Sequence, residues 1–175
     1  MATFEQFRAS FPEDNDAKGK AFEAFLADWF FLNHPEYKNK FVKVWRYADW
    51  PKPKGVPQQD LGTDLIAKDT EGKICAIQAK FHAADRKIKF RDIATFLADS
   101  SKPYINYRLL VGTAELANNA KIQLASADKP VYSFLLNRFL DWDTDWPSSL
   151  ADINSHKQRD PHEPRPHQQA AIDDV

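Results

Sequence analysis

Hydrophobic residues recur at three- and four-residue spacing between residues 17 and 32, the pattern of an amphipathic helix with one buried face. The stripe consists of Phe22, Phe25, Leu26, Trp29 and Phe30. Asp14 and its polar neighbours can cap the first turn, and Asn33-His34-Pro35 is expected to stop the helix. We therefore predict a helix over residues 17–32.

Short runs of strand-forming residues follow this segment. Residues 41–47 are rich in β-branched and aromatic side chains and predict a strand. The stretch 61–67 ends in an apolar run, and 74–81 is a second run whose only polar members are Gln78 and Lys80. Turn-forming residues separate the two runs, which predicts a β-hairpin.

The remaining pattern predicts two helices and two further strands. The helices are expected over residues 88–99 and 114–126, and the strands over 107–111 and 130–134. The resulting order is α-β-β-β-α-β-α-β, which indicates an α/β fold with one central mixed sheet flanked by helices.

Composition narrows the class of protein but says nothing about its chemistry. The 175 residues are 43% hydrophobic and 13% aromatic, enough for one well-packed core. The single cysteine, Cys75, excludes a disulfide framework and a cysteine-based zinc site. No apolar run approaches the roughly 18 residues that a membrane span needs, and no signal peptide pattern begins the chain. We expect a cytoplasmic protein without membrane contact.

Charge divides the chain into two parts. Residues 139–175 hold eight acidic and three basic residues, so the rest of this chain, whose total charge is −1, is mildly basic. Pro161, Pro164 and Pro166 disfavour a helix in the acidic part. We place a boundary there, with a folded domain over residues 1–155 and a linker over 156–175.

The polar residues of the predicted hairpin converge at one edge of the sheet. Alternation places Gln78 and Lys80 on the same side of their strand, roughly 7 Å apart. Depending on turn length, Asp64 lies opposite Ala79, Gln78 or Ile77. Carboxylate and amide oxygens suit Mg²⁺, and a nearby ammonium can stabilise negative charge on a phosphate. A buried Asp–Lys pair with a purely structural role explains the same residues.

The residues Asp64 and Gln78-Ala79-Lys80 resemble the PD-(D/E)xK nuclease motif, in the glutamine form of Mrr-like restriction endonucleases. The segment Gly62-Thr63-Asp64 looks like the Gly-x-Asp strand of these enzymes, and residues 18–23 look like their first helix. The predicted order of elements also matches. Two positions depart from the pattern, since Thr63 replaces the proline of the motif and Phe81 follows the lysine.

The resemblance implies a DNA endonuclease that depends on Mg²⁺, for which Mn²⁺ substitutes. Asp64 would be the main metal ligand, with the side-chain oxygen of Gln78 and the carbonyl of Ala79 completing the protein's share. Lys80 would orient or polarise the attacking water. Glu23 would act through the metal or its water, and a solvated helix flank is the alternative interpretation of Glu23.

Basic residues cluster after the candidate catalytic strand. Lys87, Lys89 and Arg91 lie in a segment, 73–91, that holds a single acid, Asp85. Positive charge there would hold the backbone of double-stranded DNA in a salt-dependent manner. A solvated start of a helix is the alternative interpretation.

The segment 165–172, Arg-Pro-His-Gln-Gln-Ala-Ala-Ile, resembles the one that opens the motor of superfamily 2 helicases. There Gln168 would recognise the adenine of ATP. The order of nuclease and helicase resembles the single-chain type ISP restriction–modification enzymes, in which a translocase and a methyltransferase follow the nuclease. A chance match in a linker is the alternative. The tryptophan-rich segment 141–147 would couple to the motor or belong to the nuclease domain itself.

Two other functions fit the same residues. One is an inert DNA-binding or docking module that keeps the nuclease fold, because the neutral Gln78 binds a metal more weakly than a carboxylate does. The other is a stand-alone nuclease directed by DNA modification or structure. Pairing of two nuclease domains on DNA would allow both strands to be cut.

Overall fold

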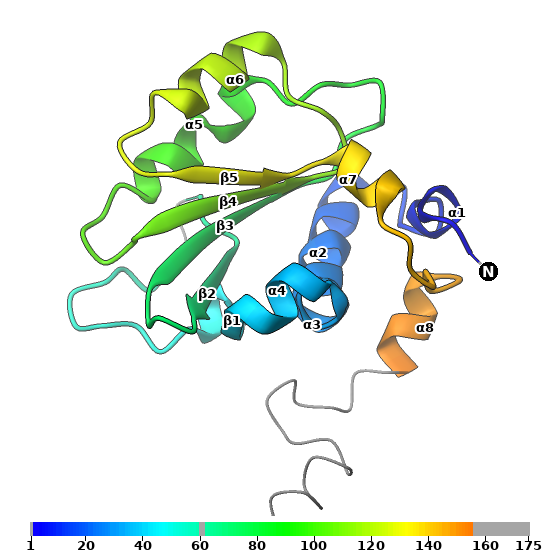
Figure 1. The fold of residues 1–175 in the computed structure, drawn as a ribbon, viewed down its shortest axis with the longest axis horizontal. Helices are drawn as coiled ribbons and strands as arrows, with labels where there is room; N and C mark the ends of the chain where they lie inside the picture. Colours follow the sequence, from blue (N-terminus) through cyan, green and yellow to red (C-terminus); the bar gives the residue numbers. More distant parts are fainter. Residues whose placement is uncertain (1, 60–61, 156–175) are drawn as a thin grey trace, which may run out of the picture.

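The computed structural model describes residues 2–59 and 62–155. Its centre is a five-stranded sheet whose strands follow one another in space as they do in sequence. The strands are β1 (Phe41–Arg46), β2 (Leu65–Asp69), β3 (Ile74–Lys80), β4 (Tyr107–Gly112) and β5 (Val131–Phe134). The first three are antiparallel and the last three parallel (Figure 1). This confirms the predicted mixed sheet of an α/β fold.

Helices cover both faces of the sheet, as Figure 1 shows. The helical segments are α1 (Phe4–Arg8), α2 (Asn15–Phe25), the π-helical turn η1 (Leu26–Phe30), α3 (Phe31–Asn33), α4 (Pro35–Lys40), the 3-10 turn η2 (Tyr47–Asp49), α5 (Phe90–Asp99), α6 (Asn118–Ala125), α7 (Leu136–Asp141) and α8 (Leu150–Ser155). The α5–α6 pair packs on one face, and the helices from α1 to α4 with α7 pack on the other. In the described part of the chain, every helix is too short or too polar to cross a membrane.

The face covered by α2 carries the aromatic core. Phe22, Phe25 and Phe30 of the predicted stripe are buried, and Asp14 caps the helix by accepting a hydrogen bond from the Ala17 amide at 2.9 Å. The helical run extends to Asn33 through η1. Pro35 then begins α4, which the sequence analysis did not predict, because a proline is favourable in the first turn of a helix.

The predicted helix over residues 114–126 begins later than expected. Leu116 forms a bridge with Ile88, and the helix α6 starts only at Asn118. Extended backbone therefore replaces its first turn, since both apolar side chains are buried in this paired conformation.

The tryptophan-rich segment belongs to the folded domain. Trp142 and Trp146 lie with their ring centroids 5.6 and 5.5 Å from that of Trp29, and Trp146 is also paired with Ala2 across a β-bridge. Trp146 is only 7% exposed. Of the two roles left open by the sequence, the structure favours packing within the folded domain.

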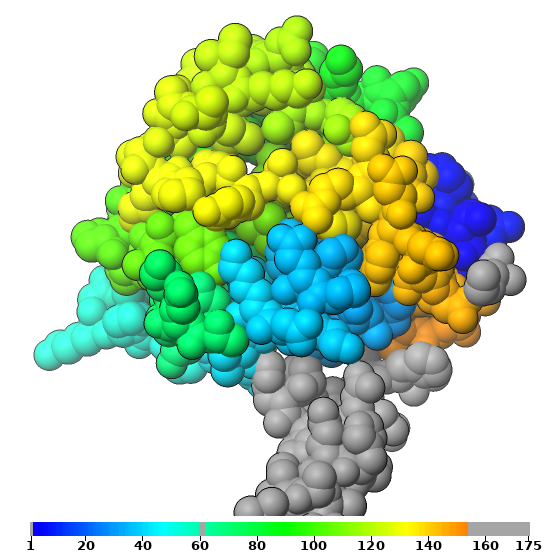
Figure 2. Space-filling view, viewed as in Figure 1, coloured from blue at the N-terminus to red at the C-terminus, as the bar shows by residue number. Residues whose placement is uncertain are grey.

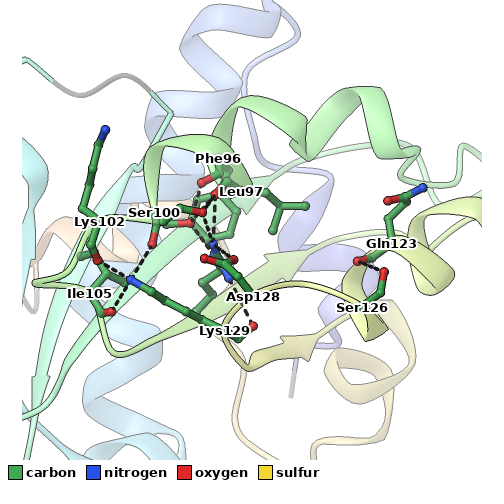
Figure 3. A network of polar contacts seen from close by, with 11 residues as sticks. Phe96, Leu97, Ser100, Lys102, Ile105, Gln123, Ser126, Asp128 and Lys129 are labelled. Carbon is green, nitrogen blue, oxygen red and sulfur yellow. Dashed lines mark hydrogen bonds and ion pairs between the residues drawn. The ribbon is translucent and has the colours of Figure 1, made fainter.

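A buried arginine ties the carboxyl end of α5 to the sheet. Arg108 on β4 is fully buried and donates hydrogen bonds to the carbonyl of Leu97 at 3.0 Å, the hydroxyl of Ser100 at 2.6 Å and the carboxylate of Asp128 at 2.8 Å. Lys129 donates to further carbonyls that follow the helix (Figure 3). The last carbonyls of a helix lack partners within the helix and carry partial negative charge. Arg108 satisfies that of Leu97, and Lys129 satisfies carbonyls of Ser100 and Ile105 just beyond the helix.

We expect Arg108→Met to lower the free energy of unfolding by about 3 kcal/mol, because several buried acceptors would lose a donor at once. The matched variant is Asp128→Asn, which should cost less than about 1 kcal/mol because this carboxylate is largely exposed. Urea denaturation measures both. The Arg108 hydrogen bond lowers the pKa of Asp128, so the small effect of Asp128→Asn should be constant above the ordinary aspartate pKa of about 4 and should shrink as the pH falls below it. Equal losses for the two variants at neutral pH would contradict this account.

Candidate active site

Asp64 stands directly opposite Gln78 where β2 begins. Leu65 pairs with Ile77, which selects one of the three registers that the sequence left open. The Asp64 Oδ2 atom accepts hydrogen bonds from Gln78 Nε2 at 2.7 Å and from the Ala79 amide at 2.8 Å. If β2 were longer, one of its backbone carbonyls would accept the hydrogen bond of the Ala79 amide. The Asp64 side chain accepts it instead.

The Ala79 carbonyl lies on the same side of β3 as this carboxylate. The Lys80 carbonyl accepts a hydrogen bond from the Thr113 amide at 3.0 Å, so it faces β4. Successive carbonyls of a strand point to opposite sides, and that of Ala79 therefore faces β2, where strand pairing has ended. Gln78 Nε2 approaches this carbonyl only at a long 3.5 Å. One carboxylate, one amide and one carbonyl are gathered at a single point.

Lys80 is half-buried and, by strand alternation, stands on the same side of β3 as Gln78. Its ammonium group forms no hydrogen bond or ion pair with any residue in 2–59 or 62–155. The purely structural Asp–Lys pair considered from the sequence is therefore not what the structure contains. This ammonium is available to an anion that approaches the Asp64–Gln78 pair.

A glycine two residues before Asp64 allows the chain to pass close to α5. A Cβ atom at Gly62 would lie 3.0 Å from backbone atoms of Thr95 and Phe96, and its φ of +148° is strained for other residues. The hydroxyl of Thr63 donates to the Asp99 carboxylate at 2.8 Å. The segment that carries Asp64 is thus seated on α5, which fixes the position of the carboxylate.

Glu23 lies half-buried on α2, beside the aromatic face of the sheet. Its neighbour Phe22 contacts the ring of Phe81, one residue beyond Lys80, with ring centroids 5.5 Å apart. Leu65 and Ile77 face this same aromatic core, so alternation directs Asp64 and Gln78 to the opposite, α5-covered face. α2, which carries Glu23, thus lies on the face of the sheet opposite to Asp64 and Gln78. A role for Glu23 at a metal remains a prediction.

The basic residues proposed from the sequence lie where β3 leads into α5. Lys87, Lys89 and Arg91 are exposed, while Ile88 between the two lysines is fully buried and anchors the loop. Their contact with DNA remains a prediction. Gln168, the predicted adenine contact, lies outside the described residues.

The sequence analysis missed a residue that clamps the strand ends. Arg8 of α1 donates hydrogen bonds to the carbonyls of His82 at 2.7 Å and Thr113 at 3.3 Å, and its guanidinium lies over the ring of Phe81. Burial lowers the pKa of Arg8. The Thr113 hydroxyl also donates to the His82 carbonyl, at 2.7 Å. An arginine in a short aromatic-rich segment offered no sequence signal for this role.

The oxygen atoms around Asp64 suit a hard divalent cation. Mg²⁺ binds through one or two carboxylates and keeps several waters, and amide and backbone carbonyl oxygens are also among its ligand types. In residues 2–59 and 62–155 there is no cluster of three or more histidine, cysteine, aspartate or glutamate side chains placed to hold a metal. Asp64, Gln78 and Ala79 together are the donor set that fits the predicted metal.

We expect Gly62→Ala to destabilise the protein by about 2 kcal/mol, because its Cβ atom would collide with the α5 backbone in a strained conformation. Gly55→Ala is the matched control, since Gly55 also has a positive φ but no atom lies within 4 Å of the position that a Cβ atom would take there. It should cost only about 1 kcal/mol. Thermal unfolding compares the two, and an equal loss would show that the contact with α5 is unimportant.

The sequence of this chain matches the model of a known protein family. The family model Mrr_cat_2, described as a restriction endonuclease, matches residues 32–156. No curated protein matches the chain.

The solved structures that are similar to it include two restriction enzymes in complex with an oligonucleotide or DNA. The ATP-dependent type ISP restriction-modification enzyme LlaBIII bound to DNA is 24% identical with a TM-score of 0.67, covering 99% of this chain and 11% of that one. The MspJI restriction endonuclease in complex with a 27-mer oligonucleotide is 14% identical with a TM-score of 0.53, covering 93% and 41%. The chain thus spans only a part of each of these enzymes, which share its fold. Because the family model covers well over half of the sequence, the chain belongs to the Mrr-type restriction endonuclease family.

Proposed function

We propose that this domain is a Mg²⁺-dependent endonuclease that hydrolyses the phosphodiester backbone of double-stranded DNA. The observation that carries the proposal is the contact of the Asp64 carboxylate with the Gln78 amide and the Ala79 backbone amide. This contact gathers oxygen donors at a strand end, beside the ammonium of Lys80, which pairs with no residue in 2–59 or 62–155. Membership in a restriction endonuclease family supports the same activity.

Each residue of the site has a defined task in this proposal. A bound divalent cation supplies Lewis acidity and lowers the pKa of a bound water. Asp64 provides the negative charge of the metal site, and Gln78 holds that carboxylate in place through its Nε2 atom. Lys80 orients the attacking water and offsets charge that develops on the scissile phosphate.

DNA is the substrate that these groups suit best. The LlaBIII and MspJI structures both contain DNA, and the fold of this chain is similar to parts of both. The exposed Lys87, Lys89 and Arg91 would contact backbone phosphates next to the site and make binding depend on salt.

We further propose that the domain is the cleavage module of an ATP-driven restriction–modification enzyme. Almost the whole chain matches about a tenth of LlaBIII, which is described as ATP-dependent. In this arrangement a helicase or translocase and a methyltransferase would share the polypeptide, ATP would act only through the motor, and two nuclease domains could meet on DNA. Gln168 would belong to the motor.

A catalytically inert docking module is the second candidate function. The observation in its favour is that Gln78, a neutral side chain, occupies the position next to Asp64 where a second carboxylate would bind a cation more strongly. Metal binding by the folded domain separates the two functions.

We expect calorimetric titration of Mn²⁺ to show binding to the wild-type domain that Asp64→Ala abolishes, because Asp64 carries the formal charge of the donor set that it forms with Gln78 and Ala79. Lys80→Met should still bind Mn²⁺, since it removes no ligand. Absence of binding to the wild type would favour the inert module.

In the complete enzyme, we expect Asp64→Ala and Lys80→Ala each to lower the rate of DNA cleavage at least about 100-fold, while DNA-stimulated ATP hydrolysis continues. Lys68→Ala, at the exposed position of β2 four residues beyond Asp64, is the matched control and should cleave normally. Plasmid cleavage assays measure the rates. Cleavage that survived both substitutions would place the chemistry elsewhere.

A further inference from the structure

A cavity lies at the other end of the sheet from Asp64. It has a volume of about 320 Å³ and is formed where α4 ends, where β2 turns into β3, and where β4 and β5 begin. These segments adjoin on the face that Figure 2 shows. Its charged lining residues are Lys40, Asp69, Glu71 and Lys73, two of each sign, and Asn106, Tyr107 and Tyr132 complete the polar lining. The volume is at the lower end of the range for small-ligand sites.

The cavity has a rigid aromatic wall. Asp69 is buried and accepts hydrogen bonds from the Tyr107 hydroxyl at 2.8 Å and from the amides of Glu71 and Lys73, both at 2.9 Å. Tyr107 is thereby fixed, and the ring of Tyr132 packs edge-on against it with centroids 5.9 Å apart. Tyr132 nevertheless remains 55% exposed, so part of its ring is open to a ligand.

One polar group of the cavity, the ammonium of Lys40, can receive an anion. The ammonium of Lys40 lies 5.0 and 5.3 Å from the ring centroids of Tyr107 and Tyr132, and it forms no ion pair or hydrogen bond with the described residues. The acceptors are already engaged: three donors hold the Asp69 carboxylate, and Lys73 lies 3.2 Å from Glu71. A positive charge is therefore left beside an exposed aromatic ring.

We propose that this cavity binds one nucleotide of a single-stranded nucleic acid, with the phosphate at Lys40 and the base against Tyr132. A positive charge next to an exposed aromatic side chain is the pairing that binds single strands with little regard to sequence. The ring of Pro130 adds an apolar surface at the edge of the cavity.

This site is separate from the candidate active site. Asp64 and Asp69 stand at the two ends of β2, roughly 17 Å apart at the usual rise of a strand. Asp69, Tyr107 and Tyr132 also belong to the face of the sheet opposite to that of Gln78, as the strand registers show. A single strand bound here would be held at a distance from the scissile phosphate.

Fluorescence anisotropy of a labelled oligothymidylate with the wild-type chain, in EDTA, tests the proposal. We expect Tyr132→Ala to weaken binding about tenfold or more and Tyr132→Phe to retain it, because stacking needs only the ring. Lys40→Met should weaken binding severalfold and reduce its dependence on salt. Lys38→Met removes the same charge from an exposed position of the same helix and should change little.

The same binding measurements distinguish the proposed nucleotide site from the proposed nuclease active site. Asp64→Ala should bind the oligonucleotide like the wild type, whether or not the domain cleaves DNA. Unchanged binding in both Tyr132→Ala and Lys40→Met, provided that circular dichroism shows both folded, would overturn the proposal, as would failure of the wild type to bind. Thymidine monophosphate that binds as tightly as the oligonucleotide would indicate a free nucleotide as the ligand and would also overturn it.

Discussion

The Asp64 carboxylate accepts a hydrogen bond that a neighbouring strand would otherwise take from the Ala79 amide, and the candidate active site depends on this substitution. It ends the pairing of β2 with β3 and exposes the Ala79 carbonyl on the same side. It also explains why a glutamine suits position 78. An amide can donate to the Asp64 oxygen at 2.7 Å, whereas a second carboxylate at that distance would repel it unless a proton or cation intervened.

The position of this carboxylate is set through α5. Arg108 and Lys129 hold the carboxyl end of the helix, and the backbone of the same helix is the surface on which Gly62 rests. Asp64 follows two residues later. A substitution that loosens α5 at Arg108 would therefore reach the site through contacts that involve no catalytic group, while the aromatic core on the opposite face remains packed.

Local periodicity was enough to predict most of the fold and to bring Asp64 within one residue of Gln78. The helix with Phe22 and Phe25 and the apolar hairpin have patterns set by their own backbone geometry. The register of the β2–β3 hairpin depends on the length of its turn, and the turn-forming residues between the strands are compatible with several lengths. Arg8 and Arg108 could not be predicted, because their partners lie far away in the sequence and only the folded chain brings them together.

Arg108 and Lys80 look alike in the sequence but differ in their hydrogen-bond partners. Arg108 and Lys80 both interrupt apolar strands, and alternation places both on the α5-covered face of the sheet. Arg108 is fully buried and has an acceptor for each of its nitrogen atoms, as burial of a charge requires. Lys80 keeps partial access to solvent and has no such acceptor among the described residues. The fold therefore satisfies the first charge, and the second is the one that the proposed function uses beside Asp64 and Gln78.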